Sequence, residues 1–278
     1  MDTPPVIPPP IPAGEIAPED LLELATAKTI LENPGLTARL SNLLGSPIEK
    51  GFKMLPRGWS ETINKVSRTA LLKTLQVAVV TMGRSAKPAK SSNRLHKLLV
   101  GASGGIGGAF GLAALAVELP ISTTIMLRSI AEIARSEGHD PRSVETKLAC
   151  LEVFALGGRT PRDDAAESGY WAVRAALAKA ISEAASYLAE KGILEKTAPA
   201  VVRLITSIAS RFGVIVSEQV AAKVVPIVGA AGGSIINVLF MNHFQDMARG
   251  HFIVKRLERN YGTARVQAAY NQLAVPVC

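Results

Sequence analysis

The chain has 278 residues, of which 48% are hydrophobic and 19% are charged, a lower share of charges than the roughly 25% usual for soluble domains. The net charge of +8 arises entirely between residues 62 and 117, where eight Lys or Arg and no Asp or Glu occur. Two cysteines, Cys150 and Cys278, exclude a disulfide framework, and the start of the chain has no signal-peptide pattern, so we predict a cytoplasmic protein.

The chain begins with a proline-rich head and continues as a series of helical patterns. Seven prolines in residues 1–18 predict a disordered tail, and residues 19–278 are expected to form one domain. The first helices are predicted at 18–32, 36–44, 47–55 and 62–81. Because no alternating strand pattern of any length occurs, the sequence predicts an all-α multi-helix bundle.

A basic segment follows the fourth predicted helix. Its five cations are Arg84, Lys87, Lys90, Arg94 and Lys97. A basic block directly before an uncharged run is typical of the cytoplasmic flank of a membrane segment, or of a patch that binds anionic lipid. A solvated loop is the alternative interpretation. No aromatic residues alternate with the cations, so no nucleic-acid partner is predicted.

Residues 98–117 are uncharged and long enough to enter a bilayer. They contain six glycines, namely Gly101, Gly104, Gly105, Gly107, Gly108 and Gly111. Glycines four residues apart let two helix backbones approach closely. Each glycine costs a water-exposed helix about 1 kcal/mol relative to Ala, so the run needs lipid or a protein core around it. Pro120 is predicted to break this helix, and a new one is expected from Ile121.

Further helices are predicted in the second half of the chain. Asp140 is expected to act as the N-cap of a helix that starts at Pro141, and other helices are predicted at about 164–191 and 200–225. A second uncharged run, 224–245, carries one more pair of spaced glycines, Gly229 and Gly233. We predict that 98–127 and 224–245 are two glycine-rich helical segments that pack against each other.

The sequence offers few candidates for chemistry. No Gly-Lys-Ser/Thr phosphate loop occurs, and the four histidines lack metal-ligand spacing, so neither cofactor nor metal is predicted. Glu118 follows the first uncharged run, where a carboxylate can be a proton-transfer group or a partner of Arg128 or a distant arginine. The interpretation that we favour is a helix-end charge or a structural ion pair. Asp164 and Asn237 complete the set of candidate catalytic residues.

Seven sequence blocks carry a resemblance to a known family. They are Leu95–Gly111, Val117-Glu118-Leu119-Pro120, Met126-Leu127-Arg128-Ser129-Ile130, Cys150–Gly157, Pro226–Ala230, Ile236-Asn237 and Arg256–Gly262. Over about residues 60–270 the chain resembles the EcsC family, which is named for a bacterial protein encoded beside ABC transporter subunits. The resemblance implies a bacterial, cytoplasmic or membrane-associated helical protein, and it implies no catalytic residues.

Three functions remain open at this point. The first is a membrane-associated, non-enzymatic accessory protein that binds anionic lipid or a membrane protein complex at the inner face of the cell membrane. The second is a hydrolase or lipid-modifying enzyme, with an apolar pocket between the glycine-rich helices where Glu118, Arg128, Asp164 and Asn237 would converge. The third is a soluble bundle that uses its glycines only for core packing.

Overall fold

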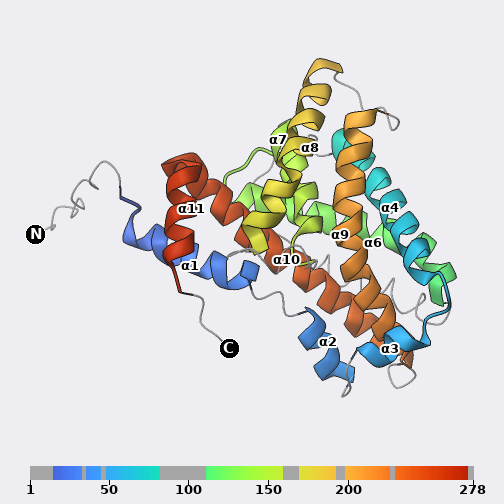
Figure 1. The fold of residues 1–278 in the computed structure, drawn as a ribbon. Helices are drawn as coiled ribbons and strands as arrows, with labels where there is room; N and C mark the ends of the chain where they lie inside the picture. Colours follow the sequence, from blue (N-terminus) through green and yellow to red (C-terminus); the bar gives the residue numbers. More distant parts are fainter. Residues whose placement is uncertain are drawn as a thin grey trace, which may run out of the picture.

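The computed structural model describes residues 15–32, 36–44, 48–81, 111–158, 169–191, 198–225 and 229–274. Within these ranges every regular element is helical (Figure 1), which confirms the all-α multi-helix prediction. The elements are α1 (Pro18–Glu32), α2 (Leu36–Leu44), α3 (Glu49–Met54), α4 (Trp59–Thr81), α6 (Gly111–Ser136), α7 (Val144–Glu152), a 3-10 turn η1 (Val153–Ala155), α8 (Gly169–Lys191), α9 (Pro199–Val224), α10 (Gly229–Tyr261) and α11 (Thr263–Gln272).

Helices α9 and α10 form the middle of the bundle. Helices α4, α8 and α3 pack on α9, while α1, α6 and α11 pack on α10 (Figure 1). Within the described residues, α9 is the one helix long and apolar enough to cross a membrane, and 56% of its most apolar window is buried inside the protein. A core helix has the same length and composition as a membrane span, so α9 by itself is weak evidence for membrane association.

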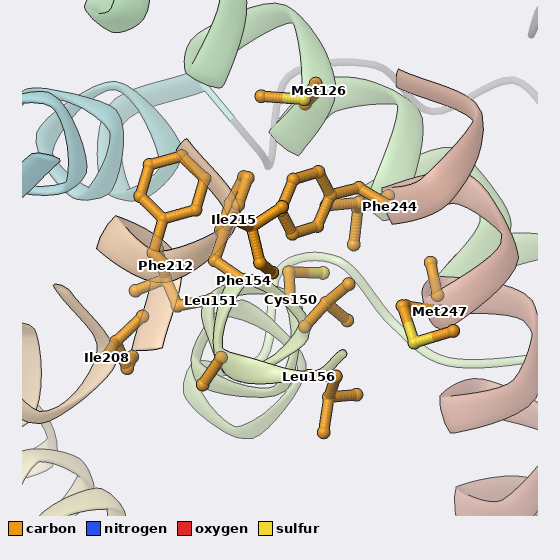
Figure 2. Close-up of a cluster of buried hydrophobic side chains, with 14 of the residues drawn as sticks. Met126, Cys150, Leu151, Phe154, Leu156, Ile208, Phe212, Ile215, Phe244 and Met247 are labelled. Carbon is orange, nitrogen blue, oxygen red and sulfur yellow. The ribbon is translucent and has the colours of Figure 1, made fainter. Parts of the chain in front are cut away.

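The core where these helices meet is aromatic and sulfur-containing at its centre. The Phe154 ring, in η1, lies 5.3 Å from that of Phe212 and 5.2 Å from that of Phe244, centroid to centroid. Met126 and the buried Cys150 thiol complete the group (Figure 2). Burial of these side chains joins η1 to α9 and α10, and aromatic pairs at these distances add to the stability from burial alone.

The described parts of the two glycine-rich segments lie side by side, in α6 and α10. Three contacts along their length show that the two helices run parallel. Asn237 contacts Glu118 near their beginnings, Gln245 donates to Ser129 Oγ at 2.8 Å, and His139, just past the end of α6, reaches the Phe252 carbonyl at 3.4 Å. The prediction that the two segments pack against each other is therefore confirmed where Glu118 meets Asn237, and the role of the spaced glycines in this packing stays a prediction.

Helix α6 continues through Pro120, so the predicted helix break is wrong. Proline removes the hydrogen bond that its own amide would give to residue 116. The three hydroxyl residues that follow bond back to carbonyls in the same turn, with Ser122 donating to Glu118 O (3.0 Å), Thr123 to Leu119 O (2.5 Å) and Thr124 to Pro120 O (2.8 Å). These hydroxyl groups bond to carbonyls other than that of residue 116, so they do not replace the lost bond. Helix α6 packs along α4 and α10, and burial of its apolar side chains on both sides of the proline holds the helix together.

Two other predicted boundaries differ from the structure. The α7 N-cap is Ser143, whose Oγ accepts from Thr146 N at 3.1 Å, whereas Asp140 stabilises the preceding turn by accepting from Arg142 N at 2.9 Å. At the head of the chain, Ile16 is buried and α1 begins at Pro18, so the predicted tail is shorter than 1–18. Residues 1–14 lie outside the described residues.

Close helix packing in the described residues depends on glycines that the sequence did not single out. A Cβ on Gly250 of α10 would lie 2.7 Å from Leu31 Cγ and 3.2 Å from the Ala27 carbonyl oxygen, both on α1. A Cβ on Gly51 of α3 would collide with the Ala221 carbonyl of α9. Among the predicted packing glycines, Gly111 and Gly229 are the first residues of α6 and α10, and Gly233 is buried in α10.

Candidate functional site

Glu118 lies in a buried polar cluster where α6, α9 and α10 meet. Its Oε1 accepts from Lys223 Nζ at 2.6 Å and from Asn237 Nδ2 at 2.8 Å. Gln219 Nε2 donates to Asn237 Oδ1 at 2.7 Å, which fixes the orientation of the amide that contacts the carboxylate. The cluster joins the last two turns of α9 to the early turns of α6 and α10.

The charges of this cluster neutralise each other away from water. The side chains of Lys223 and Glu118 are only 12% and 9% exposed. Burial lowers the pKa of Lys223, and the adjacent Glu118 carboxylate acts against this shift by favouring the charged ammonium. The interpretation of Glu118 as a member of a structural ion pair is confirmed, with Lys223 rather than an arginine as the cation in contact with it. A carboxylate held by two donors is suited to a structural role.

Large apolar side chains are exposed on the helices that form this cluster and on α3. Val117 and Ile121, one turn apart on α6, are 67% and 50% exposed, and Ile235 on α10 is 47% exposed. Met54, the last residue of α3, is 49% exposed, and α3 lies against the C-terminal part of α9. We call these four residues, Met54, Val117, Ile121 and Ile235, the apolar end.

The remaining candidates from the sequence do not join this cluster. Arg128 is exposed on α6, nearly three turns beyond Glu118, and Asp164 lies outside the described residues. The four-residue catalytic constellation is therefore not assembled by the part of the chain that the structure describes. Two further predicted sets also fall outside that part: the basic residues Arg84, Lys87, Lys90, Arg94 and Lys97, and the glycines Gly101, Gly104, Gly105, Gly107 and Gly108.

A second polar site lies at the opposite ends of α6 and α10. It is a cavity of about 440 Å³ bounded by the turn after α6, the start of α7, α8, the last turns of α10 and the start of α11. We call it the charged pocket. Its lining residues are His139, Asp140, Ser143, Glu145, Thr146, Arg174, Lys255, Glu258, Arg259 and Thr263.

One wall of the charged pocket is an ion pair with a rigid geometry. Arg174 Nη1 and Nη2 donate to the two carboxylate oxygens of Glu258 at 2.9 and 3.0 Å. The guanidinium also lies over the Trp171 ring, 4.7 Å from its centroid, and over Tyr170 at 5.4 Å. A bidentate and stacked arginine is held in one orientation, so this wall is preorganised.

Behind that wall lies a chain of buried polar groups. Arg174 Nη1 reaches the Tyr170 hydroxyl at 3.4 Å, the hydroxyl lies 3.0 Å from His251 Nδ1, and His251 Nε2 lies 3.5 Å from Glu152 Oε2. Burial lowers the pKa of His251 well below its ordinary value and raises that of Glu152. The imidazole is therefore neutral, and the Tyr170 hydroxyl links it to Arg174.

Sequence reasoning missed the charged pocket for a physical reason. The lining residues are of types that are common on protein surfaces, so none of them stands out in the sequence. The pocket forms only because the turn before α7 and the starts of α7 and α11 meet the end of α10. The turn at Asp140-Pro141 is the one local feature that the sequence shows near the pocket, and its residues predict a helix cap rather than a binding site. Across the described ranges, no group of three or more His, Cys, Asp or Glu is placed to hold a metal ion.

Comparison with known proteins places the chain in a family. The sequence model of the EcsC protein family matches residues 19–257, so the chain belongs to the EcsC family. The match begins close to the start of α1, about forty residues earlier than the resemblance predicted, and it leaves the proline-rich head outside. No curated protein and no solved structure matches the chain significantly.

Proposed function

We propose that this member of the EcsC family is a non-enzymatic accessory protein that attaches to the surface of an anionic membrane through its apolar end. The observation that carries the proposal is the exposure of three large aliphatic side chains, Val117, Ile121 and Ile235, in the early turns of α6 and α10, together with that of Met54 at the end of α3. Exposed aliphatic side chains gathered at one site gain free energy when lipid replaces water around them.

The charge near the apolar end favours an anionic surface. In residues 49–61, which include α3, the exposed cations Lys50, Lys53 and Arg57 outnumber the exposed carboxylates Glu49 and Glu61. The sequence ahead of α6 carries five more cations, between Arg84 and Lys97. Each Lys or Arg close to an anionic lipid surface contributes about 1 kcal/mol of attraction.

The Glu118 cluster supports the same proposal. An exposed carboxylate between Val117 and Ile121 would be repelled by anionic lipid. Instead it is buried and bonded to Lys223 and Asn237, so the surface around it is free of that negative charge. In this proposal the cluster keeps the apolar end both ordered and uncharged.

Sedimentation of the full chain with lipid vesicles tests the proposal. Binding is expected to vesicles that mix phosphatidylcholine with phosphatidylglycerol, and to be at least about tenfold weaker with phosphatidylcholine alone. Replacing Val117 and Ile121 together by Ser is expected to weaken binding by at least about tenfold, because both lose apolar contact with lipid. Replacing the five cations from Arg84 to Lys97 by Gln is expected to remove the preference for anionic vesicles.

A matched control is available on another helix. Leu22 on α1 is also highly exposed, so Leu22→Ser makes the same kind of change away from the apolar end and is expected to leave binding unchanged. Wild-type protein that sediments with neither kind of vesicle would contradict the proposal. Equal binding by wild type and by the Val117→Ser/Ile121→Ser variant would contradict the assignment of the surface.

A further inference from the structure

We infer that the charged pocket is a binding site for a small zwitterionic molecule, one that carries both an amine and a carboxylate or phosphate group. Lys255 and Arg259 would hold the anionic group, while Asp140 and Glu145 would hold the amine. The inference is independent of membrane attachment, since the pocket lies at the other ends of α6 and α10 from the apolar end.

The basic side of the pocket comes from α10. Lys255 and Arg259 are four residues apart, so both project from the same face of the helix into the pocket. With the residues that the structure describes, Lys255 makes neither a hydrogen bond nor an ion pair, and Arg259 donates to the Gly138 carbonyl oxygen at 2.9 Å. Neither cation is neutralised by contact with a described carboxylate.

The acidic side comes from the turn before α7 and from its first helical turn. Asp140 accepts one hydrogen bond from Arg142 N, and its carboxylate has no cation in contact among the described residues. Glu145, in the first turn of α7, likewise makes no hydrogen bond or ion pair with any residue that the structure describes. Two cations and two carboxylates thus line one cavity without touching each other, which leaves room between them for a bridging molecule.

The charge balance selects the class of ligand. Arg174 and Glu258 neutralise each other, so the charges left in the lining are Lys255, Arg259, Asp140 and Glu145, which sum to zero. A simple anion would be repelled by the two carboxylates, and a simple cation by the two basic residues. A zwitterion satisfies both sides at once. The cavity of about 440 Å³ falls in the range of small-molecule sites.

The uncharged lining residues fit the same ligand. Ser143, Thr146 and Thr263 place hydroxyl groups in the pocket. Burial lowers the pKa of His139, so its imidazole is neutral near pH 7 and leaves the charge balance unchanged. The bidentate Arg174–Glu258 pair gives the pocket a fixed wall, which reduces the entropy lost on binding.

Ligand-observed NMR titration of the full chain tests the inference. The zwitterionic probes are O-phosphoethanolamine and β-alanine, and the single-charge controls are ethanolamine, inorganic phosphate and propionate. At least one zwitterion is expected to bind at least about tenfold more tightly than the controls that carry only one of its charges. The inference is overturned if neither zwitterion binds, or if a single-charge control binds as tightly.

Variants locate the site. Lys255→Met and Glu145→Gln are each expected to weaken binding of the zwitterion by about tenfold or more, and Arg259→Gln serves as a second change on the basic side. Lys179→Met and Glu190→Gln, on the exposed face of α8, make the same changes away from the pocket and are expected to leave binding unchanged. Retention of full affinity by the two pocket variants would overturn the assignment of the site.

Discussion

The apolar end and the charged pocket lie at opposite ends of the parallel pair α6 and α10. The two sites differ in how their charged side chains are paired. At the apolar end one lysine neutralises one carboxylate, and the surface around them is aliphatic. At the charged pocket a buried ion pair is extended by Tyr170 and His251 into the interior, and further charges stand unpaired in an open cavity. The same two helices therefore present an apolar contact surface at one end and a polar recognition site at the other.

The apolar core of the bundle separates these two surfaces. Glu118 and Ser136, the last residue of α6, are 18 positions apart, which corresponds to roughly 27 Å of helix, and His139 follows in the next turn. The core between the two ends contains Phe154, Phe212 and Phe244. An apolar interior thus separates the charges at one end from those at the other. A substitution at one end is therefore expected to leave the other end unchanged.

The largest expected effect comes from removing the lysine at the apolar end. Lys223→Met leaves Glu118 buried with Asn237 as its main remaining partner, and we expect a loss of about 3 kcal/mol in the free energy of unfolding. Urea denaturation measures it. Adding Glu118→Gln to the same chain is expected to recover part of the loss, because the uncompensated charge is then absent. A loss below about 1 kcal/mol in the single variant would show that the pair is solvated.

A smaller effect is expected from the buried histidine between the two ends. Burial lowers the pKa of His243 to about 4, whereas the unfolded chain titrates near the ordinary value of 6.5. Between these values the unfolded state binds the proton and the folded state does not, so stability falls as the pH drops. From pH 7 to pH 5 His243 alone is expected to remove about 2 kcal/mol.

Denaturation at both pH values in wild type and in His243→Met measures this contribution. The variant is expected to lose less stability on acidification than wild type does. His251 and His139, whose pKa values are also lowered by burial, keep part of the pH dependence in both proteins. Identical pH dependence in the two proteins would show that the His243 ring is accessible to protons in the folded state.

At the charged pocket, a substitution that keeps the charge is expected to be costly. Arg174→Lys loses the second bond to Glu258 and the stacking over Trp171, and we expect a loss of about 1–2 kcal/mol in the free energy of unfolding. Thermal or urea denaturation measures it. If the variant were as stable as wild type, the bidentate geometry of the Arg174 guanidinium would contribute nothing to stability beyond its positive charge.

The smallest effect is expected at an ion pair that belongs to neither end. Arg203 and Glu183 join α9 to α8 at 2.8 Å, with side chains 58% and 31% exposed. Arg203→Gln is expected to change stability by at most about 0.5 kcal/mol, because water screens the pair. This variant sets the baseline against which Lys223→Met and Arg174→Lys are compared, and a larger loss would mean that exposed pairs in this protein are unusually strong.

Features encoded by neighbouring residues were predictable from the sequence. The residues predicted to form one buried stripe of α8 are Tyr170, Val173, Leu177, Ile181, Ala184 and Leu188. All are buried except Ile181, which is only partly buried, and α1 has the predicted bounds. Periodicity and helix stop signals depend on residues within a few positions of each other. The family resemblance and the all-α class followed from such local patterns, and both are confirmed.

Tertiary structure alone decided the partners and the sites. Glu118 pairs with Lys223, which is 105 positions away in the sequence, and Arg174 pairs with Glu258, which is 84 positions away. No local sequence pattern predicts either pair. Pro120 stays inside α6 because the helix is packed against α4 and α10. The sequence by itself therefore determined which segments are helical and which faces are apolar, since these depend on residues one or two turns apart. The placement of charges against one another depended on how distant helices pack, and it created both the apolar end and the charged pocket.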